Sequence, residues 1–160
     1  WEEIARLGVP IFWEILGLPD SSEATLLAQL DRLDRWADRH PEIPCVYTHG
    51  FAPGLLREPI PEPVHAILHR QQFLIEVLYP ISWGREHEYP YTELEGPLRT
   101  LVREVGASRL VWGSDMPNVL RHCTYAQSLE YLRRHLRTIG CRDVDNVLSG
   151  NLRQLFGIEG

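Results

Sequence analysis

An α/β fold with a parallel sheet is predicted by three features of the 160-residue sequence. Four short, mainly apolar runs alternate with longer segments in which apolar residues recur at helical spacing, and parallel strands need such helical crossovers. The strand starts recur every ~30 to 37 residues, within the range of successive βα units. No linker, low-complexity tract or repeat divides the chain, so residues 1–160 are expected to form one domain.

The first apolar run is almost continuous, which is typical of a strand covered on both faces. Ser21 or Ser22 is a suitable N-cap for the helix that follows it, and Pro41 and Pro44 end that helix. The third run is less regular because Glu76 interrupts it. We expect strands at 8–16, 44–50, 72–78 and 109–113, and helices at 22–40, 63–70, 92–105, 125–138, 144–148 and 152–156.

Four βα units are too few to close a barrel, which needs eight strands at this tilt. Trp1 also opens the chain in the middle of an amphipathic pattern that resembles the end of a helix. Both observations predict half of a (β/α)8 TIM barrel. On topology alone, a small, complete, open sheet of four parallel strands remains the alternative.

Composition argues against several classes of protein. The chain has 16 Lys and Arg against 22 Asp and Glu, for a formal charge of -6, and its basic residues are scattered, which disfavours nucleic-acid binding. No apolar stretch approaches the ~20 residues that span a bilayer. Without a signal-peptide pattern, a cytoplasmic protein that binds no membrane is expected. Cys45, Cys123 and Cys141 show no metal or disulfide spacing, so we expect reduced, mostly buried thiols.

Polar residues that end apolar strands are the first candidates for chemistry, because active sites of parallel α/β folds form there. Asp115 could bind a divalent metal and accept a proton, or simply stabilise a turn. His49 could bind metal or transfer a proton, or be an ordinary polar loop residue. Glu14 interrupts an apolar run, so either a cation pairs with it or the strand ends earlier.

Other polar residues carry weaker indications. Arg85 and Arg121 follow the third and fourth strands, where a guanidinium could bind a substrate carboxylate, although surface ion pairs are the simpler interpretation. His65 and His69 have the spacing of zinc-protease ligands, but Ala66 stands where such a site has its Glu, which favours a solvent-facing helix. Patterns of serine hydrolases and nucleotide-binding folds are absent from the sequence.

Several motifs together resemble the amidohydrolase-related family, which includes aminocarboxymuconate semialdehyde decarboxylase, aromatic-acid decarboxylases and hydrolases. The sequence LVWGSDMP resembles the final-strand motif of that family, and VYTHG is similar to its strand-six H-G motif. The resemblance covers essentially the whole chain through the order of these motifs. In chain order they are residues 46–50 (VYTHG), 89–91 (YPY), 106–109 (GASR), 110–117 (LVWGSDMP) and 149–157 (SGNLRQLFG).

This resemblance implies that the chain is the C-terminal half of the barrel, strands five to eight. Asp115 would then be the strand-eight metal ligand and proton shuttle, and His49 would polarise substrate or deliver a proton. Glu14 would occupy the strand-five position where the family usually has a metal-binding His, which implies either an oxygen ligand or weak metal binding. Asn151 would cap the closing helix. The family's N-terminal H-x-H or E-x-H pair is absent from the chain.

The expected function is therefore a metal-dependent hydrolase or decarboxylase that acts on a small carboxylate-bearing or cyclic substrate. The expected cofactor is a divalent metal, with zinc favoured and manganese or magnesium as options. The alternative is a non-catalytic fragment or degenerate homologue. In either case the open half-barrel predicts a homo-oligomer or association with the missing N-terminal half.

Overall fold

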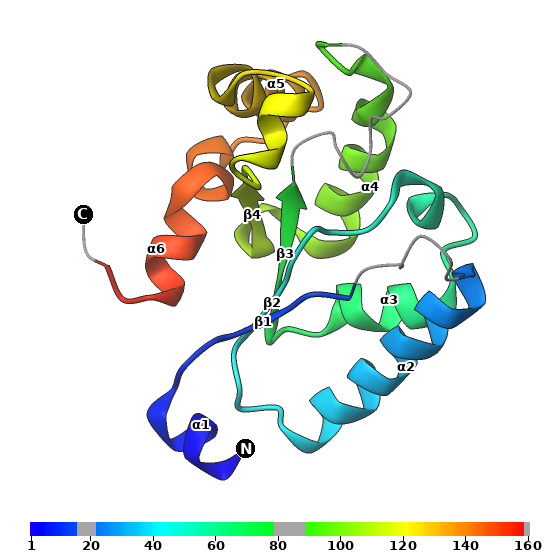
Figure 1. Ribbon diagram of the computed structural model, residues 1–160, viewed down its shortest axis with the longest axis vertical. Coiled ribbons are helices and arrows are strands. Elements are labelled where there is room, and N and C mark those ends of the chain that lie inside the picture. Colours follow the sequence, from blue (N-terminus) through cyan, green and yellow to red (C-terminus); the bar gives the residue numbers. More distant parts are fainter. Residues whose placement is uncertain (16–21, 79–88, 159–160) are drawn as a thin grey trace.

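The computed structural model describes residues 1–15, 22–78 and 89–158. It contains four parallel strands, β1 (Ile11–Trp13), β2 (Cys45–Tyr47), β3 (Phe73–Leu78) and β4 (Leu110–Gly113), which pair in the order β1-β2-β3-β4 (Figure 1). The predicted α/β fold with a parallel sheet is therefore confirmed. In a doubly wound sheet the strand order reverses at a switch point. Here the order is sequential, so right-handed crossovers all lie on the same side of the sheet.

Most helices begin and end close to their predicted positions. Ser22 accepts a hydrogen bond from the Thr25 N–H, and Thr124 and Gln127 form a capping box at the start of α5. The helices of the described chain are α1 (Glu2–Leu7), α2 (Glu23–Arg39), α3 (Glu62–His69), α4 (Glu95–Val105), α5 (Tyr125–Thr138) and α6 (Asn151–Leu155). Short 3-10 turns lie at η1 (Pro53–Leu56), η2 (Thr92–Leu94), η3 (Ala107–Arg109) and η4 (Asn118–Arg121), and a π-helical turn, η5 (Asn146–Gly150), leads directly into α6.

One face of the sheet carries the main hydrophobic core. Alternate strand residues such as Cys45, Tyr47 and Ile75 are fully buried against apolar side chains of α2 to α5. Consecutive helices of this layer also contact each other, α2 with α3, α3 with α4 and α4 with α5. In Figure 1, α2 and α3 lie on one side of the strands and α6 lies on the other.

The first strand departs from its prediction. It ends at Trp13, and Phe12 is 49% exposed, so β1 is a short edge strand instead of a run buried on both faces to residue 16. Continuous apolar character misled the prediction because an edge strand has a neighbour on one side only; residue 16 itself lies outside the described residues. The predicted free thiols are confirmed, but of the three only Cys45 is buried. No helix of the described chain is long and apolar enough to cross a membrane.

The helical tail is attached to the sheet at two points. The side-chain amide of Asn151, 6% exposed, donates to the backbone oxygens of Ala107 and Leu110, each at 2.7 Å. Its expected role as the cap of the closing helix is therefore wrong, since Asn151 is the first residue of α6 and instead secures the start of β4. Beyond α6, the Phe156 ring stacks on Phe12 of β1, with centroids 6.2 Å apart.

Candidate active site

The three strand-end residues predicted from the sequence lie at the same edge of the sheet. Glu14 directly follows β1, His49 follows β2 by two residues, and Asp115 follows β4 by two residues. Because all strands are parallel, these positions share the edge at which the strands end. Glu14 Oε1 lies 3.7 Å from His49 Nδ1, so the structure brings these two together. Glu14 is not deeply buried, since 57% of its side chain is exposed.

A fourth residue, the acidic Glu76 of β3, belongs to the same group. The His49 backbone N–H donates to Glu76 Oε2 at 2.7 Å, which connects the end of β2 to β3. Burial raises the pKa of the Glu76 carboxyl; this N–H bond opposes the shift, and the charges of Asp115 and Glu14 add to it. Glu14, His49, Glu76 and Asp115 are called the carboxyl-edge group below.

Sequence reasoning noticed Glu76 only as an irregularity of its strand. The missed indication was that Glu76 places a carboxyl group within an otherwise apolar strand. An ionised side chain in such a place needs a polar partner.

Gly113 makes room for this carboxyl. A Cβ atom at Gly113 would lie 1.8 Å from Glu76 Oε1 and 2.6 Å from its Cδ, so any larger residue would displace Glu76. The glycine that ends β4 therefore has a steric role in the site. Gly113 lies two residues before Asp115, so one short segment both makes room for the Glu76 carboxylate and carries the Asp115 carboxylate.

The backbone at both predicted catalytic residues is left-handed. His49 has φ 62° and Asp115 has φ 48°, and the only other non-glycine residue with positive φ in the described chain is Tyr91. Asp and His tolerate this region better than most residues, but it still carries a modest cost that recurs at functional sites. His49 and Asp115, both predicted from the sequence to be catalytic, are thus two of the three non-glycine residues with positive φ in the described chain.

Hydrogen bonds orient part of the group. Asn118 Nδ2 donates to Asp115 Oδ1 at 3.3 Å from the turn that follows β4. His49 Nδ1 is buried and has no hydrogen-bond partner among the described residues, an arrangement that is costly for a polar atom unless a water molecule or a ligand satisfies it. Three ligand atoms of the carboxyl-edge group do not come within 4.8 Å of one another in the described chain. The described residues of this group therefore do not by themselves complete a metal site.

Comparisons with known proteins identify the family of the chain. A family model described as Amidohydrolase matches residues 1–158. The chain belongs to this amidohydrolase family. No curated protein matches it in sequence.

Solved structures show which fold the amidohydrolase chain shares. An amidohydrolase from Burkholderia multivorans with bound zinc has a TM-score of 0.71 and 15% identity, over 99% of this chain and 57% of that one. A dihydroxybenzoic acid decarboxylase from a Polaromonas species, with bound manganese and the inhibitor 2-nitroresorcinol, has a TM-score of 0.64 and 14% identity over 99% and 52%. A putative 2-pyrone-4,6-dicarboxylic acid hydrolase from Pseudomonas putida has a TM-score of 0.54 and 21% identity over 99% and 67%. The chain thus spans little more than half the length of the first of these structures.

The substrate-binding role predicted for Arg85 and Arg121 is not tested by the described residues. Arg121 is the last residue of η4 and is exposed, in the segment that follows Asp115. Arg85 lies outside the described residues. Both remain predictions for this amidohydrolase.

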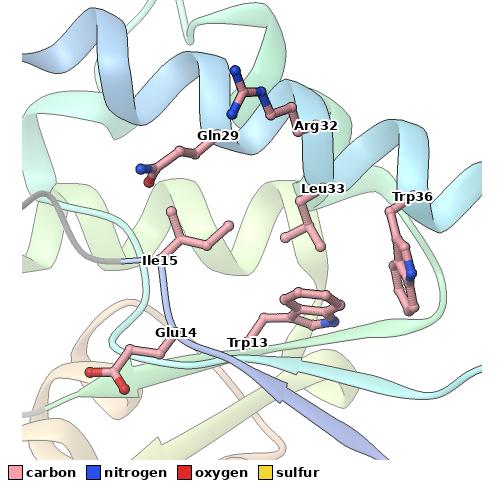
Figure 2. A pocket seen from close by; sticks show the side chains of 7 residues that line it. All are labelled: Trp13, Glu14, Ile15, Gln29, Arg32, Leu33 and Trp36. Carbon is pink, nitrogen blue, oxygen red and sulfur yellow. The ribbon is translucent and has the colours of Figure 1, made fainter. Parts of the chain in front are cut away.

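A groove of about 530 Å³ lies beside the group, between the end of β1 and α2. Figure 2 shows Trp13 and Ile15 directed toward α2, whereas the Glu14 carboxylate points away from that helix. Glu14 thus separates the groove from the side on which His49 lies, as expected from the alternation of side chains along a strand. The groove lining consists of Trp13, Glu14, Ile15, Gln29, Arg32, Leu33 and Trp36.

Proposed function

We propose that this amidohydrolase is a metal-dependent hydrolase or carboxy-lyase for a small carboxylate-bearing or cyclic substrate, and that the chain supplies strands five to eight of the barrel. The observation that carries the proposal is the convergence of Glu14, His49, Glu76 and Asp115 from four consecutive parallel strands on one edge. Solved relatives named as a decarboxylase and as a hydrolase, with 14% and 21% identity, support both reaction types.

The chemistry of the carboxyl-edge group fits a divalent cation. The carboxylates of Asp115 and Glu14 supply oxygen ligands, and the buried Nδ1 of His49, which has no hydrogen-bond partner in the described chain, is left to act on a bound substrate. Zinc and manganese, the metals named for two solved relatives, both accept carboxylate oxygen, and magnesium is the further option. We assign Asp115 and Glu14 as the ligands from this chain. A bound cation would lower the pKa of a water molecule or stabilise negative charge that develops on the substrate.

The protein groups have distinct parts in this proposal. Asp115, oriented by the amide of Asn118, accepts a proton from the attacking water or the substrate. His49 polarises the substrate or returns the proton, and Glu76 positions His49 by accepting its backbone N–H. The guanidinium groups of Arg85 and Arg121 bind the substrate carboxylate.

A non-catalytic role is the second candidate. It is favoured by Glu14, which stands where the family resemblance implies a histidine, and by the incomplete gathering of ligand atoms in the described chain. In either case we propose that the sheet associates with a further half-barrel or a second copy. The half-exposed Phe12 on the edge strand β1 supports such an interface.

The test uses the whole protein with Asp115→Asn and His49→Asn. Asparagine tolerates the left-handed backbone at both positions, so each change removes chemistry and preserves conformation. Asp145→Asn, at an exposed position in the tail, is the matched control. Turnover is measured as CO2 release from 2,6-dihydroxybenzoate and as ring opening of 2-pyrone-4,6-dicarboxylate, with metal content determined by elemental analysis.

We expect each site variant to lower kcat by roughly 10²- to 10⁴-fold, the usual contribution of a positioned acid or base. Asp115→Asn should also lower the metal content, whereas Asp145→Asn should change neither quantity. Full turnover by metal-free protein, or by Asp115→Asn, would overturn the assignment. A folded protein that binds metal and turns over neither substrate class would favour the non-catalytic candidate.

A further inference from the structure

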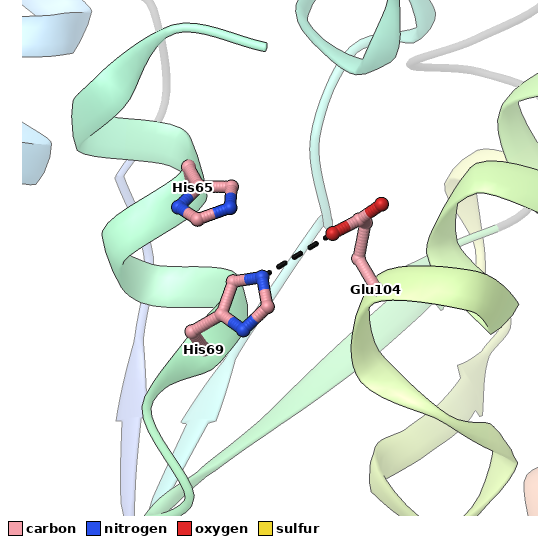
Figure 3. A group of neighbouring side chains, drawn as sticks. All are labelled: His65, His69 and Glu104. Carbon is pink, nitrogen blue, oxygen red and sulfur yellow. Dashed lines mark hydrogen bonds and ion pairs between the residues drawn. The ribbon is translucent and has the colours of Figure 1, made fainter.

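A second group of potential ligands lies away from the carboxyl edge, in the helical layer of the fold. His65 and His69 are one turn apart on α3, and Glu104 is the penultimate residue of α4. Figure 3 shows the Glu104 carboxylate facing His69, with His65 above His69 along the same helix. These three residues are called the outer cluster. None of them takes part in the function proposed above.

The spacing of the outer cluster is close to that of a metal site. His69 Nε2 and Glu104 Oε2 are 3.2 Å apart, and one ligand atom from each of the three residues lies within 4.8 Å of the others. Two ligands of a tetrahedral zinc ion at ordinary bond lengths are separated by roughly 3.3 Å. The His69 and Glu104 pair already has this separation. His65 is exposed, and its ring centroid is 4.2 Å from that of His69, so rotation of the His65 ring could bring a nitrogen into place.

A neighbouring arginine holds the Glu104 carboxylate in a suitable orientation. Arg103 Nε donates to Glu104 Oε1 at 2.6 Å, which leaves Oε2 directed at His69. This hydrogen bond is the main reason that the pKa of Glu104 is lowered, so the carboxylate is ionised at neutral pH. Only 16% of the Glu104 side chain is exposed, and partial shielding from water strengthens its attraction for a cation.

The residue types select among cations. Two imidazole nitrogens and one carboxylate oxygen suit zinc, copper or nickel, whereas magnesium and calcium prefer all-oxygen sites. Two histidines one turn apart on a single helix recur in zinc sites, but such a histidine pair supplies only two ligands. The third ligand comes here from a different helix, 35 residues further along the chain than His69.

We propose that His65, His69 and Glu104 form a zinc site of the outer helical layer, distinct from the carboxyl-edge group, in which the ion connects α3 to α4 and water completes the coordination. A cation held this way binds the folded protein and not the unfolded chain, because the ligands come together only on folding. It therefore stabilises the contact between the two helices.

The experiment is a Zn2+ titration of the whole protein against a chromophoric chelator, combined with thermal melts with and without zinc. The variants are His69→Gln and Glu104→Gln. Glu130→Gln, an exposed change of the same charge on α5, is the matched control, and Mg2+ is the control ion. All are compared in the Asp115→Asn background as well as in the native sequence, which separates this site from the carboxyl edge. His65→Gln is a further ligand variant at an exposed position, should either of the others fail to fold.

We expect His69→Gln and Glu104→Gln each to remove one equivalent of bound zinc, or to weaken zinc binding more than loss of a partner that only orients a ligand. Loss of such a partner lowers metal affinity by roughly 10- to 100-fold. The zinc-dependent rise in melting temperature should disappear with it, while Glu130→Gln keeps both and Mg2+ produces neither. The proposal is overturned if the ligand variants bind zinc with native stoichiometry and affinity. That result would leave the proposed catalytic function intact, because turnover by the outer-cluster variants is expected to be native.

Discussion

Gly113→Ala should destabilise the protein by displacing a carboxylate from the site. The added Cβ would lie 1.8 Å from Glu76 Oε1, so Glu76 must move and its 2.7 Å hydrogen bond to the His49 N–H is lost. A hydrogen bond to a charged group contributes about 1.5 to 3 kcal/mol. Replacing glycine with alanine restricts the unfolded chain and returns about 0.4 to 1 kcal/mol. The expected net loss is about 0.5 to 2.6 kcal/mol of the free energy of unfolding.

A double-mutant cycle measured by urea denaturation tests this reasoning. In a Glu76→Ala background the clash is absent, so Gly113→Ala should become neutral or stabilising, with a coupling energy of about 1.5 to 3 kcal/mol. In a Glu76→Gln background the side chain keeps its shape, and Gly113→Ala should remain destabilising. The same loss in the Glu76→Ala background as in the native protein would show that Glu76 is not what Gly113 accommodates.

Three further predictions concern contacts between segments that are distant in the sequence. Arg109 donates to three backbone oxygens around the end of α3, so Arg109→Lys, which lacks the planar fork, should lower the unfolding free energy by about 2 to 4 kcal/mol; an unchanged urea midpoint would contradict this. Asn151→Ala removes the side-chain donor from the Ala107 and Leu110 oxygens, of which the Ala107 oxygen keeps the Leu110 N–H, and should cost about 1 to 3 kcal/mol, with faster hydrogen exchange in β4 as the local readout. The hydrogen bond from Arg70 lowers the pKa of Asp38, so its stabilising contribution is complete above the ordinary value of 3.8 and is lost as the pH falls through the lowered value. Arg70→Met should therefore lose less stability than the native protein between neutral and acidic pH, and parallel pH profiles for the two would refute the linkage.

The sequence predicted the parallel sheet and most helices because their information is local. Apolar runs, proline stops and the serine cap act within a few residues, and Ser22 caps its helix as predicted. Strand-end position also identified His49 and Asp115, which the structure places on one edge with left-handed backbones.

Contacts between distant segments account for what the sequence did not predict. Whether Glu76 is a flaw in a strand or part of the site depends on Gly113 and His49, which are adjacent only in the folded chain. The His65 and His69 pair looked like a solvent-facing pattern, and Glu104 approaches it from another helix. Asn151 sits where a cap was expected, yet its hydrogen bonds reach residues more than 40 positions earlier.

The attachment of the tail has a geometric consequence for the site. Through Asn151 and Phe156, the tail contacts β4 at one side of the sheet and β1 at the other. Because the tail contacts both edge strands, it limits how far these two strands can move apart. The separation between Glu14 and Asp115, which follow those same two strands, therefore depends also on the contacts of Asn151 and Phe156. Substitutions at Asn151 and Phe156 are thus expected to change the width of the site while leaving each of its residues in place.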